Sequence, residues 1–456
     1  MVAALASVGV ANAATRDLGK LREFLLGAHA LQEFGVIHGV DASSQESISA
    51  EAAEADPTAL VTLAKGLTAK VVTASADAGA NIDMMALWPN DTNPTYIIAC
   101  NEQSPTEAGL QRINIATGAV ATIVTGTSSC DPAHVTPWGT VIFAEEAGSS
   151  GGFYELINPL TTTGVSLNRE THTFSGGTGA SNFAYRDAVG NLSFEGVAIF
   201  DNGVTYYGDE NRPGSGTPGG AYFKFVPTNL WTGGAAITSL SQSPYASGTV
   251  YGLRLGRRSG NTDWGQGSNT GEGIWVDMTS HLPDLRAGAA AEKLTGYYRP
   301  EDLQVDLAAE AAGNVRVCGN NTGNEDFANW GEAICLTDGS IAAAAANSAT
   351  PTVQLFVVGT SQLAMMDNMA YQSGLNVWYL QEDGEQKQGN NDIWACLEDG
   401  ADEDQLSDGC IRVVTLNDLN AESTGGVFDS TGKRYFVSIQ HNVTGHGVVL
   451  EITGWH

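Results

Sequence analysis

The feature that most constrains this chain is a succession of short β-prone runs, separated by turn signals, that extends from about residue 82 to residue 452. The stretch 194–227 shows the pattern. An Asp-Asn-Gly turn at 201–203 lies between two β-prone runs, and Asn-Gly in that setting is typical of a hairpin. A Gly/Ser/Pro loop then leads into a third run. About 370 residues of this kind predict an all-β fold, and the length favours a β-propeller of about six blades over a sandwich.

Further β-prone runs recur along the chain without a strict repeat at a fixed period, so the propeller prediction rests on strand number and spacing. They lie at 96–100, 118–124, 139–144, 152–157, 250–255, 273–276, 353–358, 377–380, 393–396, 411–414, 434–439 and 447–452.

The N-terminal part has a different character. Residues 1–14 are apolar and end on Ala-x-Ala, which is typical of a signal peptide, although the basic segment that normally precedes the apolar run is missing. Apolar residues at helical spacing over 17–35, and an Ala/Glu-rich segment over 46–70, predict short helices packed outside the main fold. The sequence therefore predicts a signal-peptide remnant (1–14), a helical extension (15–80) and a propeller domain (81–456).

The net charge of −30 comes from 51 acidic and 21 basic side chains. Such a surface repels nucleic acid and anionic lipid, so neither is an expected partner. No segment reaches 18 consecutive apolar residues, so we expect no membrane span. The acidity has two interpretations: solubility in salty or extracellular surroundings, or an internal carboxylate set that binds a hard cation such as Ca²⁺.

Six cysteines occur, with no Cys-x-x-Cys motif, which argues against a zinc ribbon or c-type haem. They form three pairs of sequential neighbours. In an exported protein we expect disulfides, while free thiols are the alternative. The predicted bonds are Cys100–Cys130, Cys318–Cys335 and Cys396–Cys410, and the predicted location is secreted, periplasmic or extracellular.

Carboxylates occur beside several of the predicted strands, where a propeller would collect oxygen ligands around its central channel. The clusters lie at 81–102, 136–146, 195–212, 298–306 and 367–441. Read in order, they resemble the PhoX-type family of secreted alkaline phosphatases. The matching motifs are Glu102, Thr-Pro-Trp-Gly-Thr at 136–140 followed by Glu145-Glu146, Glu195, Gly219–Val226, Arg-Pro-Glu-Asp at 299–302, Asp367-Asn368 and Gln440-His441.

The resemblance covers about residues 80–452. It implies a six-bladed propeller whose central site holds Ca²⁺ and ferric ions and hydrolyses phosphomonoesters. Two positions depart from the family pattern. Ala144 stands where the family has an iron-binding cysteine, and Phe194 where it has a histidine. The cofactor expectation is therefore Ca²⁺, with Fe³⁺ in doubt because an alanine has no ligand atom.

The candidate site residues each have a structural alternative. Glu145 and Glu146 are adjacent, so on a strand only one of them faces the channel. Arg299 either binds two phosphate oxygens with its planar fork or pairs with a neighbouring acid. His441 is expected to be a structural hydrogen-bond partner. The expected metal ligands are Glu102, Glu145, Glu146, Glu195, Glu301, Asp367, Asn368 and Glu382, with Arg299 as the expected catalytic residue.

Three functions remain open at this point. The first is a metal-dependent phosphomonoesterase, whose partner is a phosphomonoester or another small anion. The second is a non-catalytic, Ca²⁺-stabilised extracellular propeller that binds or assembles, which the loss of the thiolate at Ala144 favours. The third, a Ca²⁺-dependent lactonase or esterase, rests on fold analogy alone.

Overall fold

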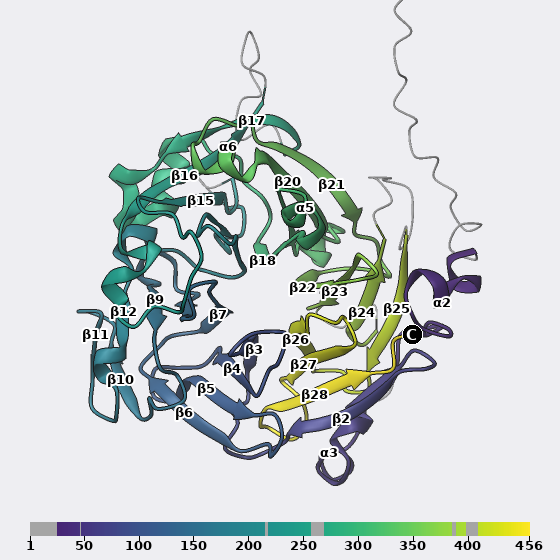
Figure 1. Cartoon of the computed structure of the whole chain (residues 1–456). Coiled ribbons are helices and arrows are strands. Elements are labelled where there is room, and N and C mark those ends of the chain that lie inside the picture. The colour runs from purple at the N-terminus through teal and green to yellow at the C-terminus, as the bar shows by residue number, and fades with distance from the viewer. Residues whose placement is uncertain (1–24, 46, 215–217, 257–268, 385–388, 398–408) are drawn as a thin grey trace, which may run out of the picture.

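The protein was analysed as a computed structural model, which describes residues 25–45, 47–214, 218–256, 269–384, 389–397 and 409–456. The expected signal-peptide remnant, residues 1–14, lies outside these ranges. Mostly antiparallel sheets are arranged around a central axis, as in a propeller (Figure 1). Among the described residues, no helix is both long enough and apolar enough to cross a membrane.

The first two sheets follow the chain from its first long strand. One has the order β11-β10-β6-β5-β4-β3 and the next the order β12-β9-β8-β7. The bounds are β3 (Ile82–Trp88), β4 (Tyr96–Asn101), β5 (Ala108–Asn114), β6 (Val120–Thr125), β10 (Val165–Asn168) and β11 (Thr173–Ser175), and β7 (Cys130–Val135), β8 (Val141–Glu145), β9 (Phe153–Leu156) and β12 (Phe183–Tyr185).

A nine-stranded sheet follows, with the order β13-β14-β15-β16-β17-β21-β20-β19-β18. Only two residue pairs join β17 to β21, so the sheet is two antiparallel halves connected at their outer strands. The bounds are β13 (Val197–Ile199), β14 (Thr205–Gly208), β15 (Tyr222–Pro227), β16 (Gly248–Leu255), β17 (Gly271–Asp277), β18 (Pro300–Val305), β19 (Asn314–Asn321), β20 (Glu332–Ser340) and β21 (Thr352–Val358).

The last two sheets have the orders β1-β25-β24-β23-β22 and β2-β28-β27-β26. The structure therefore has four separate sheets and one joined sheet, and the expected six separate blades are not seen as such. The bounds are β1 (Val61–Leu63), β22 (Met366–Gln372), β23 (Val377–Glu382), β24 (Asp392–Cys396) and β25 (Cys410–Leu416), and β2 (Thr68–Thr73), β26 (Glu422–Phe428), β27 (Arg434–Gln440) and β28 (Val448–Thr453).

The innermost strands pack side by side in a closed ring: β3 on β7, β7 on β13, β13 on β18, β18 on β22, β22 on β26 and β26 on β3. Each lies at one edge of its sheet, or at one edge of the nine-stranded sheet. The starts of these strands meet at one end of the axis, since acidic side chains at or just before the starts of β7, β13, β18 and β22 lie close together. This arrangement brings together residues that are hundreds of positions apart in the sequence.

The expected β-prone runs all overlap observed strands, and the hairpin over 194–227 is confirmed. Val197 pairs with Tyr207 across the 201–203 turn, and β15 then pairs with β14. The buried aromatic side chains of this region, among them Phe194, Phe223 and Tyr245, form one apolar cluster. Burial of such side chains, at roughly 25 cal/mol per Å² of apolar surface, stabilises the contact between neighbouring sheets.

The N-terminal segment contains less helix than the sequence predicted. Residues 25–28 are helical and short helices follow, but residues 61–73 form β1 and β2, which complete the outer edges of the last two sheets. The helix predicted to extend to residue 70 was wrong over residues 61–70. The strand partners of this segment lie some 350 to 390 positions away, so a local sequence pattern could not reveal the pairing. The helices are α2 (Ala30–Glu33), α3 (Ala50–Ala55), α4 (Leu285–Ala291), α5 (Leu307–Ala311) and α6 (Ile341–Ala345), and the 3₁₀ turns are η1 (Pro57–Leu60), η2 (Gly148–Ser150), η3 (Ala180–Asn182), η4 (Asp187–Val189), η5 (Leu240–Gln242), η6 (Pro244–Ala246), η7 (Thr279–Asp284) and η8 (Glu325–Phe327).

All six cysteines are paired, and the three predicted disulfides are confirmed. Cys318–Cys335 and Cys396–Cys410 each join neighbouring strands of one sheet, whereas Cys100–Cys130 joins β4 to β7 in the next sheet. The disulfides are consistent with an extracellular or periplasmic location.

Removing the Cys100–Cys130 disulfide by a Cys100→Ala/Cys130→Ala double variant is expected to lower the free energy of unfolding by about 3–4 kcal/mol. The chain-entropy model gives this value for a closed loop with a sequence separation of 30. Urea denaturation of parent and variant measures the difference. Equal denaturation midpoints and slopes would show that this disulfide does not constrain the unfolded chain.

Candidate metal centre

Six buried carboxylates lie at the starts of the innermost strands and form what we call the axial ring. Each is the first or second residue of its strand, except Glu195, which precedes β13 by two residues. All are less than a tenth exposed. The axial ring consists of Asp83, Asp131, Glu195, Glu301, Asp367 and Glu422.

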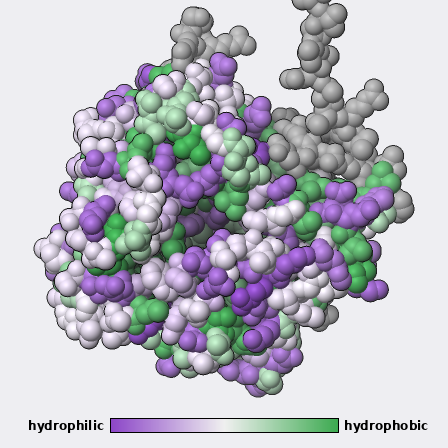
Figure 2. Space-filling view, in the orientation of Figure 1, coloured by the Kyte–Doolittle hydropathy of each residue, from purple (hydrophilic) through white to green (hydrophobic). Residues whose placement is uncertain are grey.

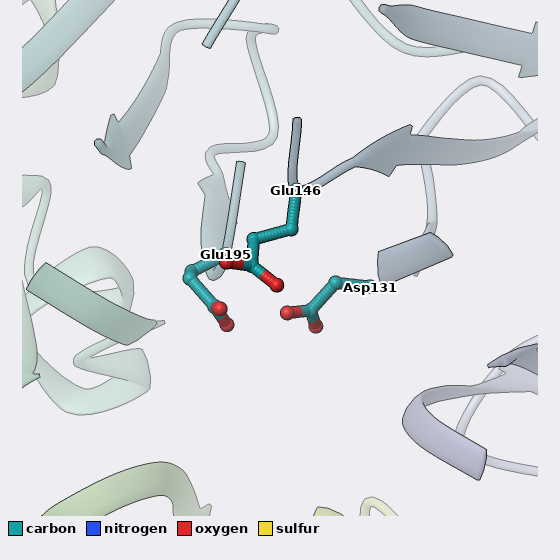
Figure 3. Close-up of side chains that lie close together, drawn as sticks. All are labelled: Asp131, Glu146 and Glu195. Carbon is teal, nitrogen blue, oxygen red and sulfur yellow. The ribbon is translucent and has the colours of Figure 1, made fainter. Parts of the chain in front are cut away.

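Two groups of carboxylates bring their oxygens close together. In the first, one oxygen each of Asp131, Glu146 and Glu195 lie within 4.8 Å of one another, and the three side chains converge from separate segments (Figure 3). In the second, the same holds for Glu195, Glu301 and Asp367. Glu195 belongs to both groups. Carboxylate oxygens at this spacing are the ligand set that Ca²⁺ prefers.

The axial ring is short of hydrogen-bond partners. Asp83 Oδ1, Asp131 Oδ1 and Glu301 Oε2 are buried and make no hydrogen bond within the described part of the chain. Glu301 Oε1 does accept a hydrogen bond from the Thr322 hydroxyl. Leaving a buried carboxylate oxygen unpaired is costly. These unpaired oxygens therefore fit a bound cation.

The electrostatics agree with this interpretation. Burial, followed by the charges of Asp131 and its other acidic neighbours, raises the pKa of Glu195 well above its ordinary value. Burial likewise raises the pKa values of Asp83 and Asp367, and nearby carboxylates raise them further. Burial, with Glu210 and Glu102 next, raises the pKa of Glu146 to about 9. Carboxylates that are buried close to one another are stabilised either by protonation or by binding a cation.

A cavity of about 710 Å³ opens above the axial ring. In Figure 2 the centre of the visible face is hollowed and hydrophilic residues gather around it. Several of the polar residues that line the cavity come from the ends of second strands: Glu102 follows β4, Glu146 follows β8, Asp383 follows β23 and His441 follows β27. The full polar lining is Glu102, Glu146, Glu210, Asn211, Arg212, Arg286, Arg299, Asp383, Asn391, Asn420, Glu422 and His441.

Arg299 lies among these acids immediately before β18. Its Nε is 2.6 Å from Glu210 Oε1 and 3.2 Å from Glu301 Oε1, and Nη2 is 4.0 Å from Asp383 Oδ2. Burial acts to lower the pKa of Arg299, but Glu301, Glu210 and Asp383 outweigh it and raise that pKa, so the guanidinium stays charged. Nη1 and Nη2 make no hydrogen bond to any described residue.

Three of the residues predicted from sequence lie elsewhere. All of the hydrogen bonds of Glu145 go to protein groups: Oε1 accepts from Ser128 N and Arg169 Nε, and Oε2 from Gly152 N and the Tyr154 hydroxyl. Glu145 therefore points away from its neighbour Glu146, as strand alternation requires.

Glu382 is likewise committed to the protein, since it accepts hydrogen bonds from Ala364 N, Asp392 N and Trp394 Nε1. Asn368 joins two innermost strands by accepting from Gly425 N. The remaining predicted residues, Glu102, Glu146, Glu195, Glu301, Asp367 and Arg299, belong to the axial ring or line the cavity.

The sequence reasoning left Asp131, Glu210, Asp383, Glu422 and Asp83 out of the candidate ligands. For Asp83, Asp131 and Glu422 the usable signal was position: an acid at the first or second residue of an innermost strand. That signal requires knowing which strands are innermost. Glu210 and Asp383 instead lie just after strand ends. His441 was expected to be structural; its Nε2 lies 3.1 Å from Glu422 Oε1 at the cavity wall.

Ala144, at the position of the family's iron-binding cysteine, does not line the cavity. It lies instead in the apolar cluster with Ile142, Phe153 and Phe194 and is fully buried. By strand alternation it shares a face with Ile142 and Glu146, and Phe153 is its cross-strand neighbour. All six cysteines are in disulfides, so no described residue offers a thiolate ligand.

In the metal-free protein, stability is expected to fall as the pH rises from about 5 to about 9. Glu146, whose pKa is raised from 4.5 to about 9, binds a proton in the folded state over a range where the unfolded state has released it. The stabilisation is complete below pH 4.5 and is lost as the pH passes the folded-state pKa. Melting temperatures in excess chelator measure this slope. A melting temperature that rises across this range would contradict the raised pKa values of the ring.

The sequence matches no protein-family profile and no curated protein. Among solved structures, PhoX of Pseudomonas fluorescens in complex with vanadate is similar over 91% of this chain and 98% of that chain, at a TM-score of 0.64 and 15% identity. A gluconolactonase from Xanthomonas campestris covers 91% and 96% (TM-score 0.44, 11% identity). A PQQ-bound aldose sugar dehydrogenase from Streptomyces coelicolor covers 86% and 99% (TM-score 0.44, 10% identity). The chain has a PhoX-like propeller fold. At this identity the likeness concerns the fold alone.

Proposed function

We propose that this protein is a secreted, calcium-dependent phosphoester hydrolase of the PhoX type, built on six blades with the nine-stranded sheet counting as two. The observation that carries the proposal is the pair of carboxylate groups that share Glu195, with ligand atoms within 4.8 Å of one another beneath a polar cavity. Arg299 supplies a fixed positive charge at the wall of that cavity. PhoX, whose structure was solved with the transition-state analogue vanadate, has the same fold.

Calcium fits the residues present and thiolate-bound iron does not. The proposed ligands, Asp83, Asp131, Glu146, Glu195, Glu301 and Asp367, offer hard oxygen atoms, of which three are buried and unpaired. Glu145, Glu382 and Asn368 are left out because protein groups already occupy their oxygens. Iron held by a thiolate would need a cysteine that this chain does not provide near the axis, so no step is assigned to it.

Within this site the chain binds and orients the phosphate group. Glu210 and Glu301 hold Nε of Arg299, which fixes the plane of the guanidinium and leaves Nη1 and Nη2 to donate to two phosphoryl oxygens. The carboxylates hold divalent cations, which when bound stabilise charge on the transferring phosphoryl group. The burial of the ring excludes bulk water and strengthens each of these interactions.

Metal analysis of the purified protein, together with hydrolysis of p-nitrophenyl phosphate in Ca²⁺ and in chelator, tests the proposal. We expect bound calcium, little iron, and hydrolysis that is lost on chelation and restored by Ca²⁺. Bound calcium without hydrolysis of any phosphomonoester would instead support the alternative described next. Absence of calcium binding would overturn both.

The alternative is a non-catalytic propeller that calcium stabilises. The replacement of an iron-binding cysteine by Ala144, and the filling of the space around Ala144 by Phe153 and Phe194, favour it. The prediction that follows is that Ala144→Cys alone does not create an iron site, because that position is fully buried in an apolar cluster. Iron content of the variant measured after expression with added iron decides this point.

A further inference from the structure

The three arginines that line the cavity above the axial ring all come from one sheet and its loops. Of the cavity's five carboxylates, four come from the four separate sheets (Glu102, Glu146, Asp383 and Glu422), and the fifth, Glu210, is paired with Arg299. The donor side of the cavity comes from residues 211–299, the nine-stranded sheet and its loops, and consists of Asn211, Arg212, Arg286 and Arg299. A chain with 51 acidic and only 21 basic side chains thus places three arginines on one wall.

Two of these arginines are fixed in place by carboxylates. Arg286 donates from Nε and Nη2 to the two oxygens of buried Asp209, at 2.8 and 2.7 Å, and also from Nη2 to the Glu210 carbonyl oxygen. Arg299 is held by Glu210, and its backbone N–H donates to the Asn211 carbonyl oxygen. These contacts fix the segment 209–212 from both sides, so the donor wall is a built surface.

Donors on this wall remain unused. Asn211 Nδ2 is buried and has no hydrogen-bond partner among the described residues. Arg212 is exposed and makes no hydrogen bond or ion pair in the described part of the chain, although it lines a cavity that also contains five carboxylates. A buried amide donor without an acceptor destabilises the fold unless a ligand or a water molecule accepts its hydrogen bond. In the proposed function, Nη1 and Nη2 of Arg299 already donate to the oxygens of one phosphate group, so these further donors are available to a second anionic group.

We propose that the donor wall of Asn211, Arg212 and Arg286 binds a second anionic group, so that the preferred ligands are phosphoesters whose leaving group carries another phosphate or carboxylate. This inference rests on the proposed function, because it takes the first phosphate to lie on Arg299. The cavity volume, about 710 Å³, is far larger than one phosphate group and lies within the range of small-molecule sites.

Calorimetry with two non-hydrolysable probes tests the second subsite without relying on activity. In Ca²⁺-saturated protein, methylenediphosphonate, with two anionic groups, is expected to bind at least tenfold more tightly than methylphosphonate, with one. Arg212→Gln and Asn211→Ala are each expected to reduce that ratio several-fold while changing methylphosphonate affinity by less than about twofold. Comparing variants in one buffer cancels chelation of Ca²⁺ by the probes.

Arg434→Gln is the matched control, because it removes one positive charge from β27 away from the cavity lining and should leave the ratio unchanged. A ratio that stays the same in Arg212→Gln, or that falls equally in Arg434→Gln, would overturn the second subsite. If methylphosphonate binds and methylenediphosphonate binds no tighter, this inference fails while the proposed function stands. If neither probe binds, both fail.

Discussion

Replacing Glu195 by Gln is expected to have opposite effects on stability with and without calcium. In Ca²⁺ the variant should lose at least tenfold in calcium affinity, about 1.4 kcal/mol, because Glu195 belongs to both carboxylate groups. In chelator the variant should melt at a higher temperature than the parent, because it removes one charge from a buried ring of like charges. For the parent, calcium at 100 times its dissociation constant should add about 2.7 kcal/mol per site.

Thermal melts of parent and Glu195→Gln, each in Ca²⁺ and in chelator, measure both effects. Glu145→Gln is the matched control, since Glu145 is an equally buried carboxylate that protein groups already satisfy, including Arg169 at 2.7 Å. It should melt lower than the parent in both conditions and keep the full calcium shift. If Ca²⁺ raises the melting temperature of Glu195→Gln as much as that of the parent, the axial ring is not the cation site.

Replacing Arg299 by Gln is expected to lower kcat/KM for p-nitrophenyl phosphate by about 10²–10³-fold, the range seen when one fixed donor to the transition state is removed. The substitution also leaves Glu210 and Glu301 without their counter-ion, so the melting temperature should fall. Arg299→Lys separates the two effects. It keeps the charge and much of the stability but loses the planar fork, so it should still be impaired in catalysis.

Steady-state kinetics on calcium-loaded protein, paired with thermal melts, measures these variants. Arg316→Gln removes an arginine from another partly buried ion pair, with Asp306 at 2.7 Å, outside the cavity lining. It should lose stability without losing kcat/KM in the folded fraction. If Arg299→Lys retains full activity, then Arg299 contributes charge alone, and its fork geometry has no part in binding phosphate.

Local pattern was sufficient to find most of the strands and part of the site. The Asn-Gly turn at 202–203 and the β-prone runs around it determine a hairpin by themselves. Glu195, Glu301 and Asp367 were recognisable because they lie beside predicted strands and within motifs that resemble the PhoX-type family. Asp131 was not recognisable, because it lies between a cysteine and a proline. Only the closure of the ring of innermost strands brings it close to Glu146 and Glu195.

The errors have a common physical origin in long-range pairing. Val61–Leu63 and Thr68–Thr73 became strands because β25 and β28 offer unpaired edges, which outweighs weak helix propensity in short segments. Glu382 looked like a ligand at a strand end, but three donors from the neighbouring loop and strand surround it. Side-chain partners of this kind are set by the register between strands, which the sequence does not display.

The pairing of β1 with β25 and of β2 with β28 has a consequence for how the protein is made. These two N-terminal strands leave the ribosome before the rest of the propeller, and their partners leave it near the end of synthesis. The segment 61–73 therefore stays without its strand partners while the intervening sheets form. Once the last strands arrive, one event joins the two ends of the chain and covers both exposed edges. Folding should thus be completed by a late docking step, and proteolysis before residue 74 should expose two sheet edges prone to association with other chains.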